Sequence, residues 1–132
     1  MASVFTQIIQ GAIPGHIVAD NAQYIALLDI RPIARGHTLV VPKQEVDYLF
    51  DLDDRTLGGL LVFAKQVALG IQKVVPCLRV GLAVVGLEVP HAHVHLVPLN
   101  SAYDIDFSKP TLQLTQEELA SIAAQIKAAI KY

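Results

Sequence analysis

The sequence predicts an α+β fold: an antiparallel sheet of about five strands with a long central helix and a C-terminal helix. Three observations support this class. Short alternating or β-branched segments recur along the chain. One long segment, residues 53–75, carries apolar residues at spacings of three and four. The strands follow one another with helices inserted between some of them, which favours antiparallel pairing over regular βαβ alternation.

The bulk composition indicates one domain, residues 1–132, with an acidic balance. The net charge is −2 and the pI is about 6.2, so no positive field favours nucleic acid or an anionic membrane as a partner. Hydrophobic residues make up 53% and the mean hydropathy is +0.47. A chain this short leaves much of its surface exposed, so we expect part of the apolar excess to be buried in a homodimer.

We expect a cytoplasmic protein with no membrane span. The longest apolar stretches are interrupted by polar residues, namely Lys65, Gln66, Gln72 and Lys73. The segment Met1–Gln10 lacks a basic region followed by a long apolar run, so we expect no signal peptide. The one cysteine, Cys77, excludes an intramolecular disulfide and a multi-cysteine zinc site.

The first third of the chain reads as a short helix followed by three strands. Val4–Ile9 is apolar and helical in character, and Gly11–Gly15 is rich in turn residues. The predicted strands, chosen for alternation and β-branched residues, are His16–Ala19, Tyr24–Leu28 and His37–Val41, the last ended by Pro42. Residues 31–36 between the second and third strands read as a loop.

The long helix begins near Asp53 and is stopped by Pro76. Asp51, Asp53 and Asp54 provide capping oxygens and negative charge at its N-terminal end. Its apolar stripe is formed by Leu57, Leu60, Leu61, Ala64, Val67, Ala68, Ile71, Val74 and Val75. Three more apolar residues, Val62, Phe63 and Leu69, lie outside that stripe and are candidates for the dimer interface.

Two further strands and a last helix complete the predicted fold. Leu78–Val85 and His91–Val97 are joined by the loop 86–90. Thr115 and Glu118 form a capping box sequence at the start of the last helix, whose apolar face is formed by Ile122, Ile126 and Ile130.

Three histidines alternate in the last predicted strand: His91, His93 and His95. In an extended segment all three imidazoles share one face, with the intervening apolar residues on the other. Three explanations are open. The imidazoles could be structural, or His91, His93 and His37 could bind a metal with Asp29 or Glu88 as outer carboxylates. They could also provide a nucleophile and a phosphate-binding imidazolium for catalysis at phosphorus.

The sequence around these histidines resembles the histidine-triad (HIT) family. The string HAHVHLVP matches its His-x-His-x-His motif with apolar residues between and after. Three more segments resemble the family in the same order: FTQIIQGAIP, ALLDIRPIARGHTLVVPK and LFDLDD. The resemblance covers about residues 4–99. It implies an α+β homodimer that hydrolyses or transfers nucleotides.

Roles for four histidines are implied by this resemblance. His93 would attack the α-phosphorus of a nucleoside phosphate derivative and form a covalent nucleotidyl-histidine, which water then releases as the monophosphate. His95 would contact phosphoryl oxygens. His91 would support the geometry of the nucleophile, and His37 would lie beside the triad in a supporting position.

The resemblance also implies a purine nucleotide site without a cofactor or a metal. Asp29 matches the position that hydrogen-bonds ribose hydroxyls, a role suited to a carboxylate. Ile8, Ile13 and Leu28 would flank the base.

The chain departs from the family pattern near the phosphate. Val80 and Leu87 stand where many relatives carry groups that hydrogen-bond, and Glu88 replaces a small hydroxyl residue. The Glu88 carboxylate would repel a phosphate, pair with an imidazolium and raise its pKa, or turn to solvent and leave phosphate binding to backbone amides. Ser3 and Thr6 stand where some relatives have zinc-binding cysteines, so we expect no zinc. The alternatives are a non-catalytic nucleotide-binding protein and a metal-dependent hydrolase.

Overall fold

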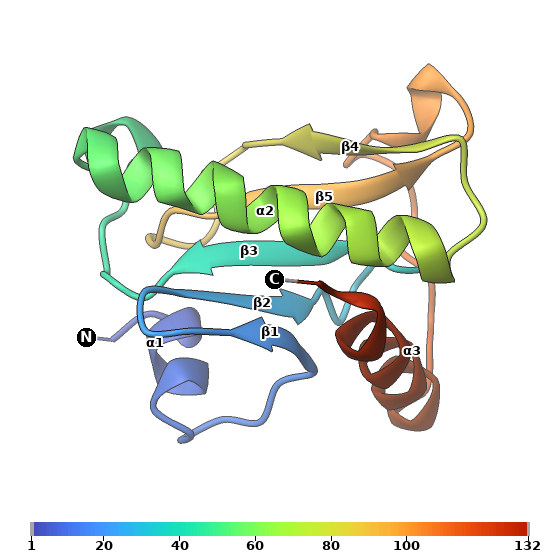
Figure 1. The fold of residues 1–132 in the computed structure, drawn as a ribbon, viewed down its shortest axis with the longest axis horizontal. Coiled ribbons are helices and arrows are strands. Elements are labelled where there is room, and N and C mark those ends of the chain that lie inside the picture. The colour runs from blue at the N-terminus through green and yellow to red at the C-terminus, as the bar shows by residue number, and fades with distance from the viewer. Residues whose placement is uncertain (1, 132) are drawn as a thin grey trace.

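A five-stranded antiparallel sheet forms the centre of the protein, in a computed structural model that describes residues 2–131. The strand order is β1-β2-β3-β5-β4 (Figure 1). The strands are β1 (Ile17–Asp20), β2 (Tyr24–Leu28), β3 (Thr38–Pro42), β4 (Arg79–Ala83) and β5 (Val94–Leu99). The helices are α1 (Val4–Ile9), α2 (Asp54–Val74) and α3 (Gln116–Ala129), with short 3₁₀ turns at Leu49–Asp51 and Ala102–Asp104. The predicted fold class and its antiparallel pairing are therefore confirmed.

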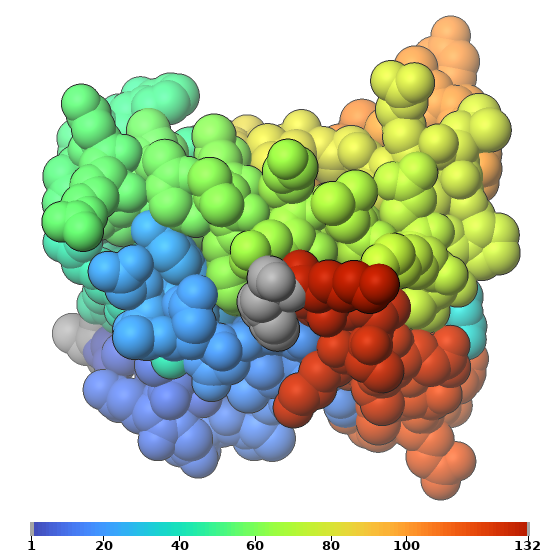
Figure 2. Space-filling model, in the orientation of Figure 1, coloured from blue at the N-terminus to red at the C-terminus, as the bar shows by residue number. Residues whose placement is uncertain are grey.

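Helices α2 and α3 cover one face of the sheet and enclose the main core (Figure 1). In the space-filling view, α2 (green) and α3 (red) close over this face (Figure 2). Capping fixes where both helices begin: Asp53 accepts from the Thr56 N–H, and Thr115 and Glu118 form the predicted capping box. The segment that carries the three histidines contributes Ala92, Val94 and Leu96 to this core, as the alternation predicts.

The predicted apolar stripe of α2 is wrong at two positions. Phe63 is buried at 2% exposure and stacks on Tyr24, whereas Leu61 is exposed at 46%. The sheet and α3 contact α2 from two directions, so its buried surface is wider and rotated relative to the stripe read from spacing. Although α2 is long and apolar enough by composition to cross a membrane, its buried residues form the core beneath it.

Helix α1 packs on the opposite face of the sheet. Phe5 lies there against residues of the two neighbouring strands, namely Ile25, Leu27, Leu39 and Val41. This six-residue helix covers only part of that face. The uncovered part lies toward β3 and β5, where the histidines are.

The triad strand begins later than predicted, at Val94 instead of His91. The Ala92 N–H donates to the Val46 carbonyl, so the chain has left the ladder with β3 at this point. His91 and His93 therefore precede the paired strand, and only His95 lies within it. The triad strand also continues two residues beyond the predicted Val97, to Leu99, and the strand predicted as Leu78–Val85 is shorter, at Arg79–Ala83. The bounds of β2 are as predicted, whereas β1 and β3 each lie one residue later than predicted.

Candidate active site

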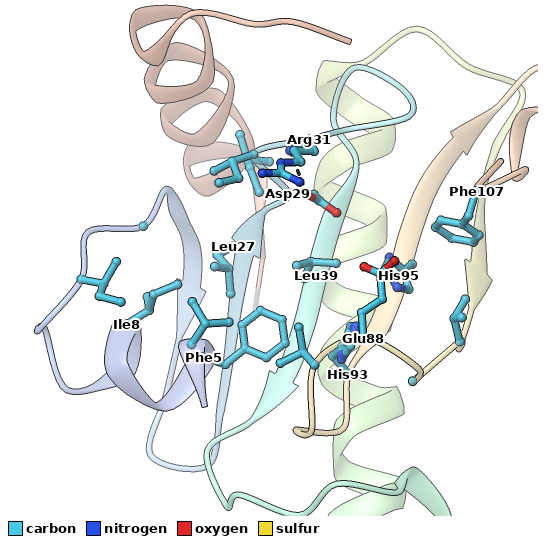
Figure 3. Close-up of a pocket in the computed structure, with 18 of the residues that line it drawn as sticks. Phe5, Ile8, Leu27, Asp29, Arg31, Leu39, Glu88, His93, His95 and Phe107 are labelled. Atoms are coloured by element: carbon cyan, nitrogen blue, oxygen red, sulfur yellow. Dashed lines mark hydrogen bonds between the residues drawn. The ribbon is translucent and has the colours of Figure 1, made fainter. Parts of the chain in front are cut away.

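A cavity of about 510 Å³ opens on the face of the sheet that α1 only partly covers. Its walls come from α1, the end of β2, the loop between β4 and β5, and Phe107 (Figure 3). One end is apolar and the other contains imidazoles, with His93 and His95 at ring-centroid separation 5.0 Å. A cavity with one apolar end and a few convergent polar groups is typical of a small-molecule site.

His93 presents an unprotonated nitrogen to this cavity. Its Nδ1 lies 2.8 Å from the backbone carbonyl of His91, and a carbonyl only accepts, so Nδ1 must carry the proton. In the neutral ring, Nε2 then carries a free lone pair. The Phe5 ring packs edge-to-face against the His93 ring at a centroid distance of 5.0 Å and so restricts the orientation of the His93 ring.

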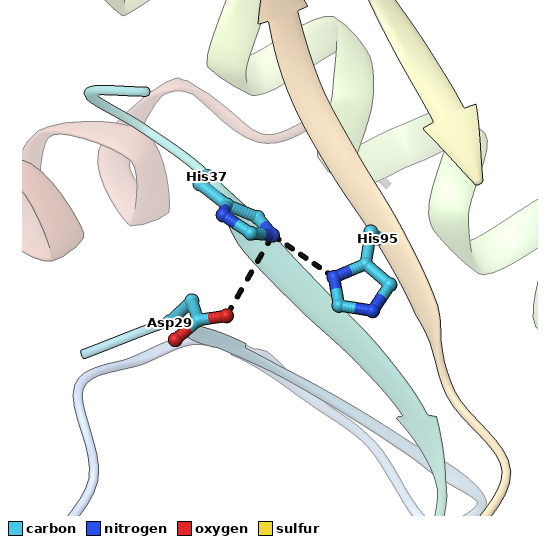
Figure 4. A group of neighbouring side chains, drawn as sticks. All are labelled: Asp29, His37 and His95. Atoms are coloured by element: carbon cyan, nitrogen blue, oxygen red, sulfur yellow. Dashed lines mark hydrogen bonds and ion pairs between the residues drawn. The ribbon is translucent and has the colours of Figure 1, made fainter. Parts of the chain in front are cut away.

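His95 presents a donor to the same cavity because His37 fixes its tautomer. The Ile33 N–H donates to His37 Nδ1 at 3.2 Å, so the proton of neutral His37 is on Nε2. That nitrogen donates to His95 Nδ1 at 2.9 Å (Figure 4). His95 therefore carries its own proton on Nε2, which is available to an anion.

Burial keeps these rings neutral near pH 7. It lowers the pKa of His37 and of His95 to about 4, and it lowers the pKa of His93 as well. The charge of Glu88 raises the pKa of His93 but is outweighed by burial. Of the possibilities for Glu88, pairing with an imidazolium whose pKa it raises does not agree with these neutral rings. Neutral rings suit a nucleophile, which needs its lone pair.

His91 is fully buried and takes no part in lining the cavity. Its Nε2 donates to the Pro42 carbonyl at 2.7 Å, and its Nδ1 faces the Ser3 hydroxyl at 2.6 Å. Both ring nitrogens are therefore occupied. What His91 offers to the site is its backbone carbonyl, which fixes the tautomer of His93.

Two carboxylates line the cavity near the imidazoles. Asp29 follows β2, and its Oδ1 accepts from the Arg31 N–H at 2.9 Å. Burial raises its pKa, while that backbone hydrogen bond and the neighbouring histidines lower it. Glu88 extends from the β4–β5 loop toward the histidines and is exposed (Figure 3). Of the three formal charges in the lining, Asp29 and Glu88 are negative and Arg31 is positive.

The metal set suggested by the sequence does not converge, because His91 has no free ring nitrogen. Asp29, His37 and His95 instead bring ligand atoms within 4.8 Å of one another (Figure 4). His37 Nε2 carries a proton and donates it to His95 Nδ1 in a hydrogen bond, however, so the two nitrogens do not offer two lone pairs to one ion. Because His37 is neutral near pH 7, its 3.7 Å contact with Asp29 is not an ion pair. Hydrogen bonding accounts for this cluster without an ion.

Most residues suggested by the sequence lie together in the cavity. His93, His95, Asp29, Leu28, Ile8, Ile13 and Glu88 line it, and His37 lies behind His95. Sequence reasoning missed Phe5, Leu27, Leu39, Arg31 and Phe107 as lining residues. Phe107 packs on His95 at a centroid distance of 4.6 Å. No sequence signal separates Phe5 and Phe107 from the other two phenylalanines, Phe50 and Phe63, which do not line the cavity.

Comparison with known proteins relates this chain to histidine-triad proteins. The HIT domain family model matches residues 10–102. The adenosine 5′-monophosphoramidase hnt1 of Schizosaccharomyces pombe is 30% identical over 99% of this chain and all of its own length. Among solved structures, a HIT-like protein from Bartonella henselae described as involved in cell-cycle regulation has a TM-score of 0.84 at 28% identity, covering 97% of this chain and 96% of its own. A hypothetical histidine triad nucleotide-binding protein from Sulfolobus tokodaii has a TM-score of 0.83 at 28% identity, covering 95% and 89%.

Proposed function

This chain belongs to the HIT domain family, and on that premise we propose that it hydrolyses a purine nucleotide conjugate at the α-phosphate through a covalent nucleotidyl-histidine. The bond broken is a phosphoramidate or a phosphoanhydride. The relative named adenosine 5′-monophosphoramidase supports the first of these. The observation that carries the proposal is the free Nε2 of His93 in a cavity large enough for a nucleotide.

The reaction proceeds in two steps. His93 Nε2 forms a bond to the α-phosphorus while the bond from phosphorus to the leaving nitrogen or oxygen breaks. A leaving amine takes a proton from solvent, and His93 becomes a cationic nucleotidyl-imidazole because Nδ1 keeps its proton. Water then forms a bond to phosphorus, the P–N bond to His93 breaks, and the proton from water returns to solvent. The products are the nucleoside monophosphate and the free leaving group.

The neighbouring groups match the other parts of such a substrate. The Nε2–H of His95 donates to a phosphoryl oxygen, where negative charge builds up as phosphorus is attacked. Asp29 accepts from ribose hydroxyls. The apolar end, which includes Phe5, Ile8, Leu27 and Leu39, receives the base (Figure 3). Water and solvent protons apart, the imidazoles and Asp29 supply the polar groups of this mechanism.

The mechanism is tested by mixing the protein with an adenosine 5′-phosphoramidate, quenching quickly, and measuring the intact mass together with monophosphate release. A nucleotidyl adduct is expected, and it should be absent from His93→Gly. His93→Ala should lose turnover while its nucleotide affinity stays within a few-fold. His16→Ala is the matched control, because His16 is a histidine outside the cavity that contacts Gln116. Undiminished turnover in His93→Ala would refute the mechanism, and binding without adduct or release would indicate a non-catalytic nucleotide-binding protein.

We further propose that the protein is a homodimer joined through β4. One edge of β4 pairs with β5, and no strand within residues 2–131 pairs with the other edge. Exposed apolar side chains gather at this edge and on the nearby outer surface of α2: Leu78, Leu82, Val84 and Val85, with Leu61, Val62 and Leu69. Two copies of an edge strand can pair antiparallel about a two-fold axis, which would bury this surface.

Light scattering after size exclusion tests the dimer. We expect a dimeric mass at micromolar concentration, and a monomeric mass for Leu82→Asp. Leu112→Asp is the control, since Leu112 is similarly exposed and lies in the segment before α3. A monomeric mass for the unmodified protein at every concentration would refute the dimer.

A further inference from the structure

A hydrogen-bonded cluster outside the cavity connects the N-terminal end of α1 to the first triad histidine. It consists of Ser3, Thr6, Glu45 and His91. The Ser3 hydroxyl lies 2.6 Å from His91 Nδ1, and these residues are 88 positions apart in the sequence. Because the Nε2–H of His91 donates to the Pro42 carbonyl, Nδ1 is an acceptor and the Ser3 hydroxyl must donate to it. Ser3 is buried at 6% exposure, so water does not readily replace this bond.

Glu45 holds Ser3 in place from the other side. Its Oε1 accepts from the Ser3 N–H at 2.7 Å and from the Thr6 hydroxyl at 2.6 Å. The Ser3 oxygen also accepts from the Thr6 N–H at 3.0 Å as the N-cap of α1. A six-residue helix is not stable by itself, so α1 depends on such tertiary contacts.

The same histidine controls the nucleophile. The His91 carbonyl accepts the Nδ1–H of His93, and α1 places Phe5 against both rings, at centroid distances of 5.7 Å from His91 and 5.0 Å from His93. A shift of His91 therefore moves both the acceptor that fixes the tautomer of His93 and the aromatic ring that orients it.

We propose that Ser3 is a positioning residue for catalysis, which acts through His91 to hold His93 in its nucleophilic tautomer, with Glu45 as its anchor. This inference rests on the proposed function for its kinetic consequence, but the tautomer itself can be observed without turnover. Removing the Ser3 hydroxyl takes away the 2.6 Å donor to His91 Nδ1 and leaves the Thr6 hydroxyl, which is 3.4 Å away and already donates to Glu45. The His91 ring can then rotate or change tautomer.

The test compares Ser3→Ala with Thr115→Ala. Thr115 is the N-cap of α3, so both changes remove a helix cap, but the Thr115 side chain bonds to Glu118 of its own helix and not to a triad histidine. We expect kcat for an adenosine 5′-phosphoramidate to fall about tenfold in Ser3→Ala with KM within about twofold, and to stay within about twofold in Thr115→Ala. Ser3→Thr, which keeps the hydroxyl, should restore most of the rate. Glu45→Ala, at an exposed position, should lower kcat about threefold and provides the comparison should Ser3→Ala fold poorly.

Long-range ¹H–¹⁵N spectra of the histidine side chains provide the second measurement. They should show His93 protonated on Nδ1 in the unmodified protein and in Thr115→Ala, and a mixture of tautomers in Ser3→Ala. Equal kcat in Ser3→Ala and Thr115→Ala, or an unchanged His93 tautomer, would overturn the inference. A changed tautomer in a protein without any hydrolytic activity would support the positioning role while refuting the proposed hydrolase.

Discussion

His37 never reaches the cavity, yet the mechanism predicts that replacing it lowers the rate. Its Nε2–H donates to His95 Nδ1 across 2.9 Å between buried rings and so holds that nitrogen as an acceptor. Without it, His95 can place its single proton on either nitrogen. The tautomer with Nε2 unprotonated cannot donate to a phosphoryl oxygen. We would test this with His37→Phe, which removes the donor but keeps a planar ring beside His95 and Phe107.

The magnitude follows from the bond that is lost. A hydrogen bond contributes about 1 kcal/mol, and leaving a buried partner unsatisfied costs about 1–3 kcal/mol. Since about 1.4 kcal/mol corresponds to a factor of ten in rate, kcat/KM should fall about 10-fold to 100-fold. His37→Gln should lose much less, because the glutamine amide can donate to His95 Nδ1 in place of His37 Nε2.

The assay is monophosphate release from an adenosine 5′-phosphoramidate at pH 7.5. His37→Phe also removes the acceptor for the Ile33 N–H, so thermal unfolding must first establish a temperature at which both variants are folded. A kcat/KM for His37→Phe within about threefold of the unmodified protein, measured under those conditions, would contradict the reasoning that His37 fixes the donor.

Three further predictions concern charge, pH and backbone strain. Glu88→Gln should raise kcat/KM for a dinucleoside polyphosphate about fivefold relative to that for a phosphoramidate. The reason is that the Glu88 carboxylate and a phosphate charge 4 Å away repel each other by about 1 kcal/mol in water. An unchanged ratio in competition assays would show that Glu88 does not face the leaving group. Because burial lowers the pKa of His93, kcat/KM should be constant above pH 7 and fall about tenfold per pH unit below that pKa as the lone pair is protonated, and a pH–rate profile rising toward acid would exclude the neutral nucleophile. Gly36→Ala should destabilise the fold by about 2 kcal/mol, since Gly36 has φ +91° and a Cβ there would lie 2.8 Å from Val75 Cγ2. A denaturant midpoint equal to that of the unmodified protein would refute the prediction that alanine is strained at this position.

The elements that the sequence predicted well are those specified by local patterns. Periodic apolar residues and a capping aspartate define α2, and a capping box defines the start of α3. Where the sheet and a second helix both pack against one helix, as they do on α2, residue spacing predicts the buried positions less well. Burial of a side chain such as Phe63 then depends on partners from elsewhere in the chain.

The histidine alternation likewise predicted the face of the sheet but not the role of each ring. His93 and His95 reach the cavity, while His91 is withdrawn because both its nitrogens are bonded to Ser3 and Pro42. Nothing within the segment 91–95 itself distinguishes the three rings, so only the family resemblance implied different roles for them.

Periodicity and a contiguous motif were enough to predict the fold class, the family resemblance and the histidine that we propose as the nucleophile. Which ring nitrogen of each histidine carries the proton depends instead on contacts that form in the folded chain. The hydrogen bond that fixes the tautomer of His95 comes from His37, 58 residues away, and the hydroxyl that contacts His91 Nδ1 comes from Ser3, 88 residues away. A neutral imidazole is a donor at one nitrogen and an acceptor at the other, so its chemistry follows from the partner that folding brings to it.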